Sequence, residues 1–323
     1  MNFKRVLLFA VVFISLAAIY FFMETSVGKR NKKEGSKLLF PELKFEKAAL
    51  IKIKSTEKGE FVLTKAKDVW QVNQNSQTYI ASTDAVEKLL DKVAKMKIET
   101  VSSRNPKNFA AFEVSNEKGI ETTILDSKNN SLATLVVGKS GPDLFSTYVR
   151  NKASNNVILT TGMLKTDFGR ELSDWRNKKI YSLKSSDITE YRVTDNMTTR
   201  FKKENDIWQA VKPELPDVNQ ETVKEAINKF ADLEAAGFVY DNNTNYGFNK
   251  PQKIITATLA AKNSQTLIIG KDKNAFQYFA KKKDGDNIYI IEKHLINLLC
   301  PSLENLNPET KPADSSKTDE TVK

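Results

Sequence analysis

Residues 68–72 read DVWQV and residues 206–210 read DIWQA, so Trp70 and Trp208 occupy matching places in a repeated pattern. Each motif is followed by a linker and then by apolar residues with the spacing of one face of a helix. These apolar positions are Val86, Leu89, Leu90, Val93 and Met96 in the first copy and Val223, Ala226, Ile227, Phe230 and Leu233 in the second. Because the distance between the copies stays constant from the first of these positions to the last, the pattern predicts an internal duplication.

Further matches follow in the same order along the two copies. The matching pairs are AFEV at 111–114 with YGFN at 246–249, TLVVGK at 134–139 with TLIIGK at 266–271, STYVRN at 146–151 with FQYFAK at 276–281, and NVILTT at 156–161 with NIYIIE at 287–292. Each copy then ends in a short apolar segment, at 162–172 and at 292–300, which is expected to be helical. Two tandem units of similar fold are therefore predicted.

The segments around each helix have the alternation of β-strands. Residues 50–56 and 60–65 alternate apolar and polar side chains on either side of a turn at Lys58-Gly59, which predicts a hairpin. Further short strands are separated by turn residues, as in 127–130 and at Asp284-Gly285. Strands joined by short turns pair antiparallel, so the predicted class is α+β and not a doubly wound parallel sheet.

The N-terminus carries an apolar run at residues 6–23 without a single charge. As a helix this run would span about 27 Å, close to the thickness of a bilayer. A cleaved signal peptide is the alternative, but the run ends in bulky residues, Tyr20 to Met23, and not in a small-x-small site. The segment is therefore interpreted as an uncleaved signal anchor, preceded by Lys4 and Arg5, with the bulk of the chain outside the cytoplasm.

These features predict the organisation of the whole chain. The expected parts are a cytoplasmic tail at 1–5, a transmembrane anchor at 6–23, a basic juxtamembrane linker at 24–48, a first α+β repeat at 49–183, a second at 184–306 and a disordered tail at 307–323.

Residues that could carry chemistry are scarce. The chain has one cysteine, Cys300, and one histidine, His294, which excludes a disulfide framework and multi-thiolate or multi-histidine metal sites. The VGKSG segment at 137–141 resembles a phosphate-binding loop, but Ala133 stands where that loop needs glycine. No catalytic, cofactor-binding or metal-ligating residue is therefore predicted, and no cofactor.

The net charge of +10 raises the question of nucleic-acid binding. Beyond Lys33 the basic residues alternate with acidic ones, and no basic run is interleaved with aromatic residues as a single-strand platform requires. A solvated surface of mixed charge is expected, and nucleic acid is not an expected partner. The expected partners are membrane lipid, through residues 6–23, and another membrane protein.

The residues quoted above resemble a bacterial family known as domain of unknown function 4340. The resemblance is carried by Val69-Trp70 and Ile207-Trp208, the YGF-x-x-P element at 246–251, Gly138 and Gly270 at strand ends, Tyr148 and Tyr278 on the strand that follows, and residues 175–178, WRNK. It covers residues from about 49 to 300. In the first copy Ala111 stands in place of the family's glycine, so a different local turn is expected there.

The resemblance implies an accessory protein of the bacterial inner membrane, because such proteins are often encoded beside ABC-2-type or gliding-motility-like transport systems. The expected function is that of a non-enzymatic binding or scaffold subunit, with an ABC-type permease as its partner. Two alternatives stay open: a cell-envelope enzyme, such as a hydrolase acting on a wall polymer, and a stand-alone substrate-binding module.

Overall fold

The chain forms two compact units, one ending at Asn177 and the next beginning at Lys178, in a computed structural model that describes residues 15, 37–241 and 244–307. The sequence predicts the boundary between the units after residue 183, whereas in the structure the boundary lies after Asn177. The reason is backbone pairing: Ile180 N donates to Leu233 O at 2.7 Å, and Leu183 N donates to Ala231 O at 2.8 Å. These hydrogen bonds place residues 180–183, which the sequence assigns to the first repeat, in the second unit.

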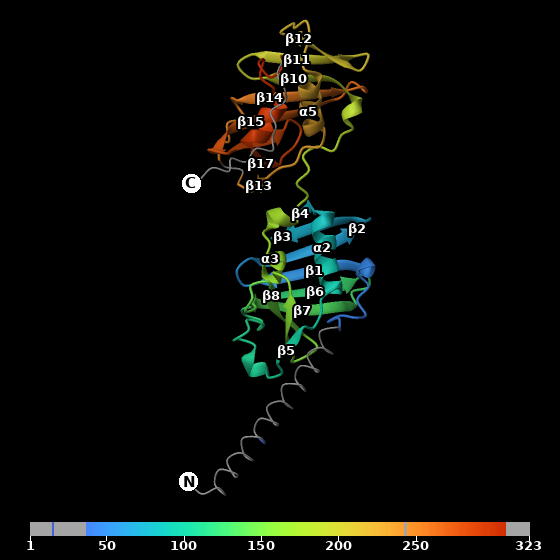
Figure 1. Cartoon of the computed structure of the whole chain (residues 1–323), viewed down its shortest axis with the longest axis vertical. Helices are drawn as coiled ribbons and strands as arrows, with labels where there is room; N and C mark the ends of the chain where they lie inside the picture. Colours follow the sequence, from blue (N-terminus) through green and yellow to red (C-terminus); the bar gives the residue numbers. More distant parts are fainter. Residues whose placement is uncertain (1–14, 16–36, 242–243, 308–323) are drawn as a thin grey trace, which may run out of the picture. The chain divides into compact units, whose positions relative to one another are not determined.

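The first unit contains nine strands and three α-helices among its described residues (Figure 1). The strands are β1 (Ala48–Ser55), β2 (Gly59–Ala66), β3 (Val69–Gln74), β4 (Gln77–Ile80), β5 (Thr100–Ser103), β6 (Ile120–Asp126), β7 (Ser131–Ser140), β8 (Ser146–Asn151) and β9 (Val157–Thr161). The helices are α2 (Thr83–Ala94), α3 (Leu164–Phe168) and α4 (Leu172–Trp175), with short 3-10 turns η1 (Phe45–Lys47) and η2 (Pro106–Asn108).

The second unit contains eight strands and two α-helices among its described residues. The strands are β10 (Ile188–Thr194), β11 (Thr198–Glu204), β12 (Ile207–Lys212), β13 (Gly237–Val239), β14 (Lys253–Leu259), β15 (Ser264–Asn274), β16 (Gln277–Lys282) and β17 (Ile288–Glu292). The helices are α5 (Gln220–Ala231) and α6 (Lys293–Leu299), preceded by η3 (Ser185–Asp187).

The two sheets have the same strand order. It is β4-β3-β2-β1-β6-β7-β8-β9-β5 in the first unit and β12-β11-β10-β14-β15-β16-β17-β13 in the second, with every pairing antiparallel. The first sheet differs only by β4, which adds a strand outside β3. Mostly antiparallel sheets with few helices confirm the predicted α+β class.

Each sheet buries one face under its long helix, α2 in the first unit and α5 in the second (Figure 1). The two repeated tryptophans belong to these cores, with Trp70 2% and Trp208 4% exposed. Alternation explains the burial, because Ile51 and Ile53 on β1 point inward while Lys52 between them is exposed. The periodic apolar face of each helix then covers the inward side chains of its sheet.

Each unit is closed by the same contact between its last residues and the start of its long helix. Ser82 caps α2, and its backbone N–H donates to Trp175 O at 2.8 Å. Asn219 caps α5, and its backbone N–H donates to Leu306 O at 2.9 Å. Trp175 and Leu306 are both fully buried, so the terminal segment is part of the core in each unit.

The predicted membrane anchor at 6–23 lies outside the described residues, apart from Ser15, as do most of the linker and the tail beyond Asn307. Among the helices that the structure does describe, none combines the length and apolar character needed to cross a membrane. The anchor therefore stays a prediction.

Candidate functional site

The outer face of the first sheet, opposite α2, is covered by the loop of residues 104–119. Val136 points to this face, because its neighbours on β7 belong to the core beneath α2, and it packs against Val114 of the loop. Arg150 on β8 holds the loop in place: its Nε donates to Val114 O at 3.2 Å and its guanidinium lies 4.3 Å from the centroid of the Phe109 ring. Burial lowers the pKa of Arg150, which nonetheless stays charged.

The second unit has a matching loop, in which Tyr246-Gly247-Phe248 lies against the end of β15. The two loops make the same backbone hydrogen bond to their sheets, from Lys139 N to Phe112 O at 3.2 Å and from Lys271 N to Tyr246 O at 2.9 Å. Each also forms the same ring pair, with centroids 4.7 Å apart, between Phe112 and Tyr148 and between Tyr246 and Phe279.

These contacts correct the predicted alignment of the two copies. Phe112 matches Tyr246, so the residue at the place of Gly247 is Glu113 and not Ala111. Likewise the residue of the second copy that corresponds to Tyr148 is Phe279 and not Tyr278. The expected difference in the local turn is wrong: both copies place a left-handed residue at the same point, with φ +57° at Glu113 and +82° at Gly247.

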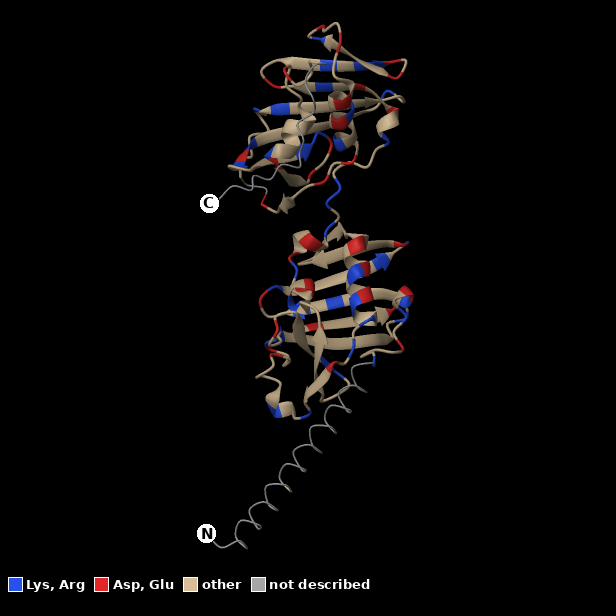
Figure 2. Ribbon diagram, viewed as in Figure 1, with Lys and Arg blue, Asp and Glu red and all other residues tan. Residues whose placement is uncertain are grey.

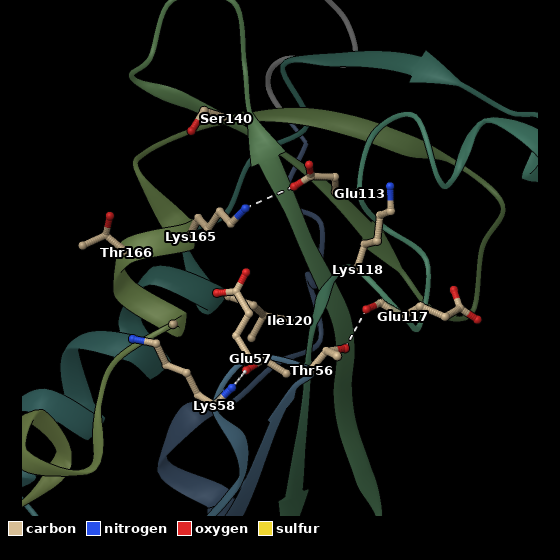
Figure 3. Close-up of a pocket in the computed structure, with 12 residues that line it drawn as sticks. Thr56, Glu57, Lys58, Glu113, Glu117, Lys118, Ile120, Ser140, Lys165 and Thr166 are labelled. Atoms are coloured by element: carbon tan, nitrogen blue, oxygen red, sulfur yellow. Dashed lines mark hydrogen bonds and ion pairs between the residues drawn. The ribbon is translucent and has the colours of Figure 1, made fainter.

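The left-handed conformation suits glycine, whereas a side chain with a Cβ atom is strained there. Glu113 nevertheless occupies this position in the first unit. Its carboxylate lies 3.1 Å from Lys165 Nζ on α3, and both residues line the same cleft (Figure 3). Because strained residues concentrate at functional sites, Glu113 makes this cleft the leading candidate.

The cleft has a volume of about 570 Å³ and lies between the β1–β2 turn, the covering loop, the end of β7 and α3. Its lining is polar apart from Ile120 and the glycine at 169. The lining residues are Ser55, Thr56, Glu57, Lys58, Glu113, Glu117, Lys118, Ile120, Ser140, Lys165, Thr166 and Gly169. Thr56 joins two of its walls, because its hydroxyl donates to Glu117 O at 2.6 Å.

Some charges of the cleft are neutralised within the protein and others are not. Lys58 Nζ lies 2.6 Å from Glu171 Oε1, and Lys165 pairs with Glu113. Glu57 and Lys118 form no ion pair with any residue in the described part of the chain. Figure 3 shows the Glu57 side chain directed into the cleft. The pKa of Glu117 is held below its ordinary value by a hydrogen bond from the Ser115 side chain.

This arrangement suits binding of a polar group that carries charge of either sign. The cleft contains hydroxyls, ammonium groups and carboxylates, but no histidine or cysteine lines it. Within residues 37–241 and 244–307 no group of histidine, cysteine and carboxylate side chains could hold a metal ion. Three glutamates and three lysines are the groups in the cleft that could donate or accept a proton.

The glycine-lysine pairs at 138–139 and 270–271 have a structural reason for their repetition. A Cβ atom at Gly138 would lie 2.3 Å from Phe112 O, and one at Gly270 would lie 2.1 Å from Tyr246 O. Glycine is required because the covering loop lies against the strand at this point. Both pairs belong to continuous strands, β7 and β15, and neither opens a helix as a phosphate-binding loop does.

The two rare reactive residues lie apart from the cleft, in the second unit. Burial raises the pKa of the Cys300 thiol to about 12, so the thiol stays protonated at neutral pH and is a weak nucleophile. His294 is exposed at the start of α6. The cleft itself was missed by sequence reasoning; the only signal available was the loss of the loop glycine in one copy.

A comparison with protein families gives one match: a family model described as domain of unknown function (DUF4340) aligns with residues 70–251. Searches among curated proteins and among solved structures return no match. The family match begins at the first repeated tryptophan and ends at Pro251, after the YGF loop of the second copy, so it includes elements of both units. Since it covers more than half of the sequence, the chain belongs to the DUF4340 family.

Proposed function

We propose that this protein is a non-enzymatic, membrane-anchored binding or scaffold subunit outside the cytoplasm, accessory to an ABC-type transport complex of the bacterial inner membrane. Residues 6–23 serve as its single transmembrane anchor, and the two α+β units follow outside. The placement beside a transport system rests on the family resemblance, while the binding role rests on what the two units share.

The observation that carries the binding role is the kind of feature that the duplication retains. Both units keep a buried tryptophan, the same closing contact, a glycine under the covering loop and an aromatic pair on the outer face. The Glu113 carboxylate in the cleft of the first unit has no such counterpart, because Gly247 occupies the matching position. The packing features are the same in both units, whereas the charged residue Glu113 is not. This pattern favours a binding role for the units over a catalytic one.

The charge distribution supports a protein or lipid partner over nucleic acid. Figure 2 shows basic and acidic segments interspersed on both units, without a continuous basic stripe on the ribbon. Nucleic-acid binding depends on clustered lysine and arginine along one face. The mixed surface instead suits contacts of modest area with another polar surface.

The test is purification of the full chain from native membranes in a mild detergent, followed by identification of co-purifying proteins. The proposal expects permease and ATPase subunits of a transporter to be recovered with the wild-type chain. A variant with charged residues introduced into 6–23 should lose them. Recovery of the chain from the soluble fraction, or without any transporter subunit, would contradict the proposal.

The envelope hydrolase remains the second candidate, and the three glutamates in the cleft favour it. Here Glu113→Gln and Glu57→Gln distinguish the two functions. If the scaffold role is correct, both variants fold, co-purify with the partner and support growth or transport like the wild type. If either variant folds and co-purifies but abolishes function, the hydrolase replaces the scaffold.

A further inference from the structure

One turn in each sheet exposes large apolar side chains: the β7–β8 turn in the first unit and the β15–β16 turn in the second. In the β7–β8 turn Leu144 and Phe145 are each 70% exposed, and in the β15–β16 turn Phe276 is 75% exposed. These are the three most exposed large apolar side chains of the described residues. Removing such groups from water is favourable, so the two turns, here called the aromatic tips, are candidate contact sites.

The two aromatic tips are equivalent positions of the duplication. Phe145 O accepts a hydrogen bond from Gly162 N at 2.6 Å, and Phe276 O accepts one from Lys293 N at 2.8 Å. The residues after the two donors, Met163 and His294, are also exposed. The exposed phenylalanine is therefore kept in both units although the neighbouring turn residues differ.

Both tips are held in shape by their own hydrogen bonds. In the first, Gly141 N donates to Ser146 O at 2.8 Å, and Leu144 adopts a left-handed conformation with φ +62°. In the second, Phe276 N donates to the Asn274 side chain at 2.8 Å. A leucine held in a strained conformation with its side chain in water is unfavourable for folding alone.

Lysines accompany the aromatic tips. Lys139 and Lys271 are exposed at equivalent places on the strands that lead into the turns. Lys273 is exposed in the second turn region, and Lys293 pairs with Asp272 beside it. The second tip thus combines a projecting aromatic side chain with two exposed lysines, whereas the first has one exposed lysine, Lys139, and an exposed carboxylate, Asp143, beside Leu144.

We infer that the aromatic tips insert into the interface of an anionic lipid bilayer. Aromatic and aliphatic side chains are favourable at the boundary between head groups and acyl chains, and lysines beside them contact lipid phosphates. A protein partner fits less well, because stable interfaces bury about 800 Å² on each side, whereas each tip exposes only one to three apolar side chains.

This inference rests in part on the proposed membrane anchoring. Residues 24–36 separate the predicted anchor from the first described residues of the first unit. Fully extended, such a segment reaches about 45 Å, which keeps the first unit within reach of the bilayer surface. Each tip is nevertheless argued on its own contacts, and the experiment below separates the two claims.

The test is quenching of added tryptophans by brominated lipids, with the full chain in vesicles of phosphatidylethanolamine and phosphatidylglycerol. The native tryptophans Trp70, Trp175 and Trp208 are buried and give a constant background. Phe145→Trp and Phe276→Trp are expected to add fluorescence that is quenched and shifted to shorter wavelength. Met197→Trp, in the exposed β10–β11 turn, is the matched control and should remain unquenched.

The outcomes distinguish the tips from the anchor. A chain that resists carbonate extraction but whose tip tryptophans are not quenched overturns the inference and leaves the anchor in place. A second outcome is that carbonate extracts the chain from the vesicles, that the wild type floats with them, and that the variant with aspartate at 145 and 276 does not. This outcome supports the tips and contradicts the anchor. Absence from the vesicles altogether contradicts both.

Two further results would also overturn the inference. One is equal quenching of the Met197→Trp control, which would indicate unspecific adsorption. The other is a photo-crosslinker at position 145 or 276 that captures a protein and not lipid in native membranes.

Discussion

The two units protect the edge next to their repeated tryptophan by different means. In the first, β4 pairs with β3, and Ala81 N donates to Trp70 O at 2.8 Å. Among its described residues the second unit has no such strand, and the side chain of Gln220 replaces it: Trp208 N donates to its Oε1 at 2.9 Å and its Nε2 donates to Trp208 O at 2.8 Å. One primary amide thus satisfies the backbone groups that otherwise need a strand.

A second contrast lies within the sheets. Glu190 and Arg200 of the second unit form a bidentate ion pair, with Arg200 Nε and Nη2 each 2.7 Å from a carboxylate oxygen. By strand register, the corresponding residues of the first unit are Leu50 and Val62. The same backbone therefore accepts an apolar pair or a charged one on its outer face, and the charge composition of the two units could diverge without a change of fold.

The largest expected effect tests whether the units are independent. Trp70→Ala should lower the free energy of unfolding of the first unit by about 3–5 kcal/mol, because it leaves a large cavity, and Trp208→Ala should do the same in the second. Hydrogen exchange of peptides from each unit, followed in urea, measures both. Val69→Ala, beside Trp70 but 45% exposed, is the control with little expected effect. Simultaneous loss of protection in both units would show that they unfold as one.

The next effect concerns the protected edge. Gln220→Ala leaves the N–H and C=O of Trp208 without their partner and should destabilise the second unit by about 1–3 kcal/mol. Gln220→Glu retains an acceptor but no donor, so an intermediate loss is expected. Thr83→Ala, at the corresponding first position of α2, should have little effect. If Gln220→Ala and the wild type were equally stable in urea unfolding, the Gln220 amide would not be needed to satisfy the backbone groups of Trp208.

The left-handed position of the covering loop gives a smaller effect, which is expected in the second unit and nearly absent in the first. Gly247→Ala should destabilise the second unit by about 1–2 kcal/mol, because its Cβ would lie 2.8 Å from Lys271 N in a conformation unfavourable for side chains. Glu113→Gly should change the first unit by less than about 0.5 kcal/mol, since relief of strain offsets the greater freedom of the unfolded chain and the lost ion pair. Chemical denaturation measures both changes; a clear loss with Glu113→Gly would assign the carboxylate a structural role.

The smallest effect distinguishes the units by pH. Hydrogen bonds from Arg200 hold the pKa of Glu190 below its ordinary value of 4.5. The stabilisation is therefore present above pH 4.5 and is lost as the pH falls through the lowered pKa of the folded state. Because both groups are partly exposed, about 0.2–1 kcal/mol is expected. Unfolding of the second unit between pH 6 and pH 3, compared with the variant Glu190→Leu with Arg200→Val, should show a dependence that the variant has lost.

Much of the fold could be predicted from the sequence, because it depends on periodicity. The duplication, the long helices and most strands follow from apolar spacing, and the burial of Trp70 and Trp208 follows from their repetition. The edge strand β4, with the sequence QTYI, was missed because its pairing depends on β3 and not on its own pattern.

The cleft and the aromatic tips could not be predicted in the same way. Glutamate has no local preference for a left-handed conformation, so the sequence pointed to Ala111 and not to Glu113 as the substitute for glycine. The exposure of Phe145 and Phe276 was equally hidden, since an aromatic residue before a strand has the pattern of a core position. Both features depend on tertiary contacts, namely the loop against Gly138 and the hydrogen bonds to the two phenylalanine carbonyls.

The closing contact at the end of each unit has a consequence for synthesis on the ribosome. The start of α2 is joined to Trp175, so the first unit can complete its core once residues up to about 177 have emerged, before the strands of the second unit have left the ribosome. A nascent chain with two sets of similar strands is exposed to pairing between the wrong copies. Because the first set is sealed by its own last residues, vectorial synthesis separates the copies in time.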